Sequence, residues 1–287
     1  MTHRAPTSGA CLCGAVRYTV AGPFGLMAHC HCSMCRKHHG SLFATFVGAP
    51  LMGFKWLSGT EHILQYPSSE KGRRGSCRHC GSVTPLLIEA MDMVLIPAGN
   101  LEGDLDIRPQ YHAFVGSKAP WHTITDGLPQ HEEYPPEVDL TGVSRAPVDV
   151  PEGYTAGSCL CGDVAFEVTG PAMTMRHCHC TRCRRGLSAA HATNVFYPLQ
   201  NLRYTRGADL VAEYRVPEAR YFKMAFCRHC GGAAPRSSHE RGIVIVSAGI
   251  LDSDPGVRPV EHIYVGSKAN WFDITDGLPQ FEGAPSA

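Results

Sequence analysis

The sequence predicts a mainly β chain built from two copies of one cysteine-rich domain. Three observations support this prediction: short segments alternate apolar and polar residues, whole phrases recur at a regular spacing, and thirty glycines and twenty-one prolines lie between the segments as turn residues. With 287 residues, 44% of them hydrophobic, the chain is long enough for two domains with apolar cores.

The strand pattern is clearest at residues 16–20, where Val16, Tyr18 and Val20 alternate with polar residues, and the same pattern returns at residues 164–168. Further strands are expected at residues 42–47, 93–97, 111–115, 243–247 and 262–265. No amphipathic helix of three turns is expected.

The duplication is visible as repeated phrases. Cys-Leu-Cys-Gly at Cys11 returns at Cys159, an offset of 148, and Cys-Arg-His-Cys-Gly at Cys77 returns at Cys227, an offset of 150. A two-residue insertion therefore lies between Tyr214 and Cys227. We expect a first domain at residues 1–134, an extended linker at 135–153 and a second domain at 154–287.

Composition argues against several classes of partner. The 26 basic and 26 acidic residues cancel, so no net field attracts nucleic acid or an anionic membrane. No apolar run approaches the ~18 residues that cross a bilayer, and the first residues lack the apolar segment of a signal peptide. These features favour a cytoplasmic protein with neither nucleic-acid nor membrane partners.

Fourteen cysteines, seven in each copy, point to metal binding, because seven cannot pair as disulfides within a copy. Structural zinc prefers four thiolates, whereas catalytic zinc usually has three protein ligands and one exchangeable position. Two distant pairs per copy suit a closed zinc site: Cys11, Cys13, Cys77 and Cys80, and Cys159, Cys161, Cys227 and Cys230. The remaining triples suit an open, catalytic zinc site: Cys30, Cys32 and Cys35, and Cys178, Cys180 and Cys183. This gives two zinc ions per domain and up to four per chain.

The alternative is that a histidine closes each triple. Only His29 or His31, through the equivalent His177 or His179, could do so in the same way in both copies. If these segments are extended, the histidines point away from the cysteines, which favours an open position.

The residues resemble the glutathione-dependent formaldehyde-activating enzymes, a group that includes the centromere protein V-like proteins. Both copies carry Cys-x-Cys-Gly, His-Cys-x-Cys-x-x-Cys-Arg, Cys-x-x-Cys-Gly, and a tail with Val-Gly-Ser-Lys-Ala and Thr-Asp-Gly-Leu-Pro-Gln. The resemblance implies an Mss4-like β fold, a structural zinc on the outer pairs and a catalytic zinc on the triple. It also implies carbon–sulfur lyase activity that joins formaldehyde and glutathione as S-hydroxymethylglutathione. One departure is Gly186 in the second copy, which falls two positions before the equivalent of Gly40.

Glutathione carries two carboxylates, so cations are expected near the open sites. The candidates are Arg36 and Arg184, which directly follow the triples, and Lys118 and Lys268 in the repeated Gly-Ser-Lys phrase. The four histidines named above are candidate general acids for the carbonyl oxygen. The expected role of Trp121 and Trp271 is in the core, and that of Asp126 and Asp276 is in turns.

The sequence thus predicts a zinc-dependent enzyme that acts on a small-molecule thiol and an aldehyde, or on their adduct. Two other classes stay open: a non-catalytic interaction module made of tandem zinc domains, and a zinc or thiol-stress buffer. A monomer whose two domains pair like a homodimer is compatible with the duplication.

Overall fold

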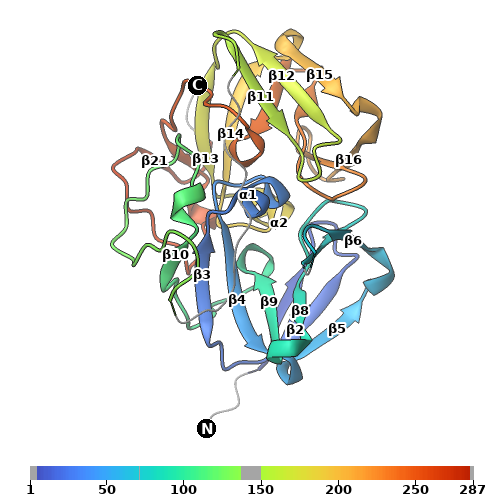
Figure 1. Cartoon of the computed structure of the whole chain (residues 1–287), viewed down its shortest axis with the longest axis vertical. Helices are drawn as coiled ribbons and strands as arrows, with labels where there is room; N and C mark the ends of the chain where they lie inside the picture. The colour runs from blue at the N-terminus through green and yellow to red at the C-terminus, as the bar shows by residue number, and fades with distance from the viewer. Residues whose placement is uncertain (1–4, 71, 137–149, 285–287) are drawn as a thin grey trace.

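The computed structural model of the chain describes residues 5–70, 72–136 and 150–284, and within these ranges it is mainly β with two short α-helices (Figure 1). Residues 137–149 of the expected linker lie outside the described residues. No helix in the described ranges is long and apolar enough to cross a membrane.

The strands of the first repeat are β1 Thr7–Ala10, β2 Arg17–Val20, β3 Leu26–Cys30, β4 Ala44–Pro50, β5 Phe54–Ser58, β6 Ile63–Pro67, β7 Arg73–Cys77, β8 Leu86–Ile88, β9 Met93–Pro97 and β10 Tyr111–Ala113. They form a three-stranded sheet in the order β1-β2-β5, a five-stranded sheet in the order β10-β3-β4-β9-β8, and the hairpin β6-β7. In the five-stranded sheet β10 pairs parallel to β3, and the other pairs are antiparallel.

The strands of the second repeat are β11 Tyr154–Ser158, β12 Ala165–Thr169, β13 Thr174–Cys178, β14 Ala192–Pro198, β15 Leu202–Arg206, β16 Val211–Arg215, β17 Lys223–Cys227, β18 Arg236–Ser238, β19 Ile243–Ser247, β20 His262–Ile263 and β21 Gln280–Phe281. The sheets correspond to those of the first repeat: β11-β12-β15, then β18-β19-β14-β13-β20-β21, and the hairpin β16-β17.

Every strand expected from the alternation overlaps an observed strand, and the differences lie at the ends. The strands expected at 111–115 and 262–265 end early, at Ala113 and Ile263. The next residues, Phe114 and Tyr264, have φ angles of 60° and 59°, which break the extended backbone.

The two α-helices, α1 (Ser33–His39) and α2 (Thr181–Leu187), begin within the cysteine triples. The Cys35 amide donates to the Cys32 sulfur at 3.3 Å, so a metal-ligand candidate also caps the helix. Seven residues are too few to show a clear 3.6-residue period, which is why the sequence pattern did not reveal these helices. In Figure 1 both helices lie near the middle of the molecule, where the two repeats meet.

The repeats share one apolar core, since a single cluster of buried side chains includes Val20 and Met27 of the first repeat and Phe166 and Met175 of the second. Their contacts are reciprocal. A 3₁₀ turn containing Gly99 packs on the end of α2, and the turn containing the equivalent Gly249 packs on the end of α1. The chain therefore folds as an internal pseudo-dimer.

A buried ion pair also joins the repeats. The Lys37 ammonium, only 4% exposed, lies 2.6 Å from the Asp252 carboxylate and donates to the Ser158 carbonyl at 2.9 Å. Paired in this way, a buried charge is a constraint on how the repeats can pack, because a misdocked arrangement would leave the ammonium unpaired.

Candidate metal centres and their pockets

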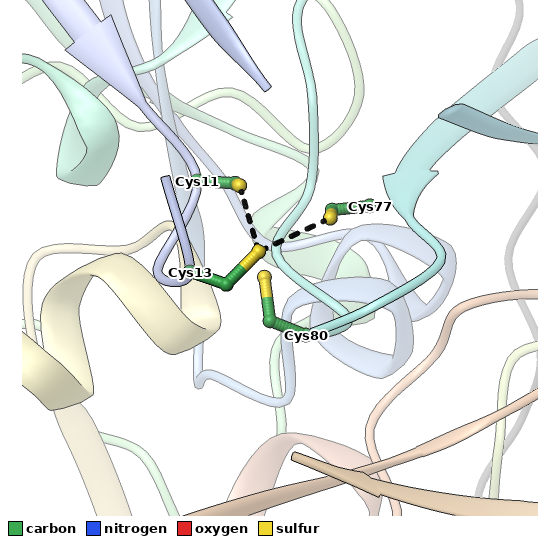
Figure 2. A group of neighbouring side chains, drawn as sticks. All are labelled: Cys11, Cys13, Cys77 and Cys80. Carbon is green, nitrogen blue, oxygen red and sulfur yellow. Dashed lines mark hydrogen bonds between the residues drawn. The ribbon is translucent and has the colours of Figure 1, made fainter. Parts of the chain in front are cut away.

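The two distant cysteine pairs of the first repeat meet in space, as the spacing predicted. Figure 2 shows the sulfur atoms of Cys11, Cys13, Cys77 and Cys80 pointing toward one another, two from the turn after β1 and two from the end of β7 and the turn that follows it. The Cys13 sulfur lies 3.5 Å from that of Cys11 and 3.7 Å from that of Cys77. A tetrahedron of sulfurs around zinc, with Zn–S bonds of ~2.3 Å, has edges of roughly 3.8 Å, so this donor set fits a structural zinc ion.

The second repeat reproduces this arrangement. The Cys161 sulfur lies 3.4 Å from that of Cys159 and 3.8 Å from that of Cys227, and Cys230 completes the group. The cysteines of both groups are buried or half-buried, which shields such a site from solvent exchange.

The three cysteines of each triple also lie close together in space. The sulfurs of Cys30, Cys32 and Cys35 all lie within 4.8 Å of one another, as do those of Cys178, Cys180 and Cys183. In each repeat the first cysteine is the last residue of a central strand, and the other two lie at the start of the short helix. Among the described residues, no histidine or carboxylate joins either group of three. The triples can therefore supply three ligands and leave one position free.

Crowding of these thiols changes their acidity. Hydrogen bonds from Cys30 and Cys32 lower the pKa of Cys35 well below its usual value, whereas the neighbouring thiols raise the pKa of Cys30. In the second repeat, hydrogen bonds from its neighbours lower the pKa of Cys180 to about 3. Three buried thiols this close cannot all ionise without a cation between them, so the donor set fits a soft divalent ion.

The candidate histidines point to the opposite side of the strands, as expected for extended segments. His29 Nδ1 lies 2.8 Å from the Thr45 hydroxyl, and His31 Nε2 lies 2.8 Å from His112 Nδ1. Burial lowers the pKa of both His29 and His31 well below the usual value. His177 and His179 repeat these bonds with Thr193 and His262. Only His29 of these four also lines a pocket beside a triple.

The candidate cations are engaged elsewhere. Arg36 Nε donates to the His31 carbonyl at 3.3 Å, and Lys118 Nζ donates to the His122 carbonyl at 2.7 Å. Arg184 donates to the Ser267 carbonyl and Lys268 to the Phe272 carbonyl. None of the four lines the cavity beside either triple. The structure thus assigns them contacts with backbone carbonyls and does not bring them to the open sites.

A cavity of about 290 Å³ adjoins the first triple. Its walls are largely apolar, with Met34, Phe46 and Leu86 among them. The guanidinium of Arg74 lies 3.5 Å from the Cys35 sulfur, and the Tyr134 ring faces Phe114 at a centroid distance of 4.6 Å. Burial raises the pKa of Tyr134 to about 12, so its hydroxyl keeps its proton at neutral pH.

A larger cavity, about 530 Å³, adjoins the second triple and is lined by many cations. Its cationic residues are Arg176, Arg182, Arg220, Lys223, Arg236 and Arg241, and its lining contains one acid, Glu218. Part of its wall is the loop between β16 and β17, where the sequence showed the two-residue insertion. The insertion was therefore the one sign in the sequence that this loop differs between the repeats and could form part of the wall of the second cavity.

The repeated phrase near the end of each repeat forms a hydrogen-bonded chain. Asp126 accepts from His112 Nε2 at 3.0 Å and from the Leu128 amide at 3.0 Å, and Asp276, His262 and Leu278 repeat both bonds. These aspartates therefore shape a turn, as expected, and also hold a histidine. Trp121 and Trp271 are each 2% exposed and belong to the shared core.

Comparison with known proteins assigns the chain to a family. The family model described as "Glutathione-dependent formaldehyde-activating enzyme" matches residues 6–117 and 154–267, one match in each repeat. Among solved structures, a crystal structure of a Rhodobacter sphaeroides protein is 31% identical and covers 36% of this chain and 97% of its own, with a TM-score of 0.29. No curated protein matches the chain. With both repeats matched over most of their length, the chain belongs to the glutathione-dependent formaldehyde-activating enzyme family.

Proposed function

We propose that the protein is a zinc-dependent carbon–sulfur lyase that forms or cleaves S-hydroxymethylglutathione at its cysteine triples. The observation that carries this proposal is the convergence of three thiols, with no fourth ligand among the described residues, at the edge of a cavity in each repeat. The family match supports glutathione and formaldehyde as the reactants.

The closed groups of four and the open triples have different roles in this proposal. The groups of four would hold zinc as a structural cross-link between loops that are more than sixty residues apart in sequence. The triples would hold the catalytic zinc, which when bound lowers the pKa of an incoming thiol so that it reacts at neutral pH. Three sulfur ligands suit exchange of a further sulfur ligand better than activation of water.

The side chains of the chain itself position the reactants. In the forward direction the glutathione sulfur loses its proton and adds to the aldehyde carbon, a carbon–sulfur bond forms, and the carbonyl π electrons move to oxygen, which gains a proton. Cleavage reverses each of these movements. In the first repeat Tyr134 can donate that proton, because its hydroxyl stays protonated and its ring lines the cavity beside Cys30 and Cys35.

The proposal is tested by exchange NMR on glutathione and formaldehyde at equilibrium. The protein is expected to speed exchange between free and adduct signals above the rate in buffer, since proximity and proton donation accelerate an addition that also occurs unaided. Exchange at the buffer rate would contradict the proposal. If chelation then removes metal from the triples while the fold persists, that result would favour a zinc buffer.

A further inference from the structure

The walls of the two open sites differ at equivalent positions. Four positions that are apolar in the first repeat are polar or cationic in the second, and each member of each pair lines its own cavity. The pairs, first repeat before second, are Ala28 and Arg176, Met34 and Arg182, Phe46 and Asn194, and Leu86 and Arg236. The difference is therefore built into the wall of the site and is not confined to its rim.

A fifth exchange lies next to the triple. Arg74, whose guanidinium lies 3.5 Å from the Cys35 sulfur, corresponds to Met224 in the second repeat. Met224 packs against Gly186, where a Cβ would lie 2.7 Å from the methionine sulfur. The early glycine of the second copy thus makes room for this methionine. Among the described residues that line the first cavity, Arg73 and Arg74 are the only arginines, and Arg74 already contacts the cysteine sulfur.

The outer cations of the second cavity are held in place by aromatic rings. The guanidinium carbons of Arg220 and Arg241 lie 4.8 Å and 5.5 Å from the centre of the Tyr221 ring, and that of Arg182 lies 5.4 Å from the centre of the Phe222 ring. Both rings belong to the loop with the insertion. Stacking on a ring restricts a guanidinium but leaves its N–H groups free to bind an anion.

Not all of these cations are neutralised by acids of the protein. Within the part of the chain that the structure describes, ion pairs join Arg176 to Glu261, Arg220 to Glu240 and Lys223 to Glu213. Among the same described residues, none joins Arg182, Arg236 or Arg241 to an acid. Two or more guanidinium groups with free N–H donors are suited to a ligand with two separated carboxylates.

We propose that the two open sites have diverged in substrate class: the second repeat binds thiol adducts that carry carboxylates, as glutathione does, and the first repeat binds thiols or adducts with an apolar, uncharged remainder. This inference rests on the proposed function, because it takes both triples as sites for thiols. The cavity volumes agree with it, since the second cavity is nearly twice as large as the first.

The test measures binding of S-methylglutathione, which has both carboxylates but no free thiol, by calorimetry on the zinc-loaded protein. Wild type is expected to bind one equivalent, and the dimethyl ester of the same compound is expected to bind at least about 10-fold more weakly. The double variant Arg220→Ala, Arg241→Ala and the single variant Arg182→Met should lose affinity to a similar degree. Arg203→Ala, which removes an exposed arginine outside the cavity, is the matched control and should bind as wild type does.

A converse variant tests the first site. Met34→Arg gives the first wall the cation of the second and is expected to create a second, weaker equivalent of S-methylglutathione binding. Two equivalents of equal affinity in wild type, or unchanged affinity in the arginine variants, would overturn the proposal. Because S-methylglutathione cannot react, these outcomes are independent of the exchange measurement that tests the proposed function.

A separate cluster between the repeats carries a second inference. His177, His262 and Asp276 offer ligand atoms that all lie within 4.8 Å of one another, beside a cavity of about 240 Å³. His262 Nε2 lies 2.9 Å and 3.0 Å from the two carboxylate oxygens of Asp276. Within the described residues, only the second repeat brings this trio so close.

The second ring nitrogens of this cluster have hydrogen-bond partners of their own. His177 Nδ1 lies 2.9 Å from the Thr193 hydroxyl, and His262 Nδ1 lies 2.8 Å from His179 Nε2. A metal ion would displace the proton that His262 Nε2 donates to Asp276; with both Nδ1 atoms then donating, both Nε2 atoms would face the ion with lone pairs. Metal-binding histidines usually donate from their second nitrogen in this way, which fixes the ring and its tautomer.

We infer that His177, His262 and Asp276 form a further metal site, of the two-histidine and one-carboxylate type, for a divalent first-row transition ion. The test titrates Co²⁺ into zinc-loaded protein and follows visible absorption. One equivalent should bind with ligand-field bands but without sulfur-to-cobalt charge-transfer absorption, because no cysteine is in the cluster.

Two variants and their equivalents in the first repeat decide the result. His262→Ala and the conservative Asp276→Asn should each abolish this uptake, whereas His112→Ala and Asp126→Asn should retain it. No uptake by wild type, uptake that survives Asp276→Asn, or a charge-transfer band that places cobalt on cysteine would each overturn the inference.

Discussion

Thr125 and Thr275 occupy equivalent positions in the two repeats, and their hydroxyl oxygens lie 2.6 Å apart. A residue meets its own equivalent only on or near a twofold axis, so this contact marks the pseudo-twofold axis of the internal dimer. Around it the repeats are not identical. Phe43 corresponds to His191, and His122 corresponds to Phe272, so each repeat contributes one phenylalanine and one histidine in opposite order.

The two buried histidines of this set, His122 and His191, predict that the stability of the fold depends on pH. Burial lowers the pKa of His122 and His191 to about 3 each, against 6.5 for the usual histidine. The unfolded chain therefore binds more protons between these values, so stability is full above pH 6.5 and falls as the pH drops towards 3. Between pH 7 and pH 5 the loss is about 2 kcal/mol per histidine.

The double variant His122→Phe, His191→Phe places in each position the residue that the other repeat carries. Urea unfolding at pH 7 and pH 5 should show a smaller loss of unfolding free energy for this variant than for wild type. Equal losses in the two proteins would show that these histidines are not buried in their neutral form.

Close packing at the turn that carries Gly99 predicts a specific intolerance. A Cβ at this position would lie 2.3 Å from the Ala189 amide nitrogen, and backbone cannot move aside cheaply. Gly99→Ala should lower the unfolding free energy by about 2 kcal/mol. Gly127→Ala, where a Cβ would meet nothing within 4 Å, is the control and should be neutral in the same thermal melt. Similar melting temperatures for the two variants would contradict the packing described between the repeats.

The groups of four sulfurs should contribute to stability and the triples to reactivity. Cys80→Ser removes one of four ligands from a buried closed group and should lower the melting temperature by more than ~10 °C, equivalent to several kcal/mol. Cys35→Ser should cost less, because its group already has an open side. Calorimetric melts of both variants test this ranking, and a larger loss for Cys35→Ser would reverse the proposed roles.

Tyr134 provides a test of proton donation. In a Cys183→Ser background, which leaves only the first open site, Tyr134→Phe should slow exchange between formaldehyde and glutathione dimethyl ester, whose carboxylates are masked, by about 10-fold to 100-fold without changing zinc content. The matched variant Tyr111→Phe alters another tyrosine of the same cavity and should have a smaller effect. An unchanged rate in Tyr134→Phe would leave water as the proton donor.

The sequence was most informative about features that a repeated residue pattern determines. The alternation of apolar and polar residues located the strands. The cysteine spacing, repeated in both copies, was enough to expect Cys11 near Cys77, although 66 residues separate them in the sequence. The short helices could not be seen because capping by Cys32 and contacts with the other repeat stabilise them more than any periodic pattern does.

The pocket walls were missed for a different reason. Arg36 and Lys118 looked suitable because they are adjacent to motifs, but their side chains donate hydrogen bonds to backbone carbonyls. The cations that do line the second cavity, such as Arg220 and Arg241, come from loops that no motif marks. Comparing the repeats position by position, for example Met34 with Arg182, would have revealed the difference.

The central claim is that each cysteine triple is a separate zinc site at which a thiol and formaldehyde exchange. It is tested most directly by measuring zinc content and NMR exchange rate on the same samples of wild type, Cys35→Ser, Cys183→Ser and the double variant. We expect about four, three, three and two zinc equivalents, as the two groups of four and two groups of three imply, with exchange at the buffer rate in the double variant. Exchange that persists in a folded double variant with two zinc ions would contradict the account.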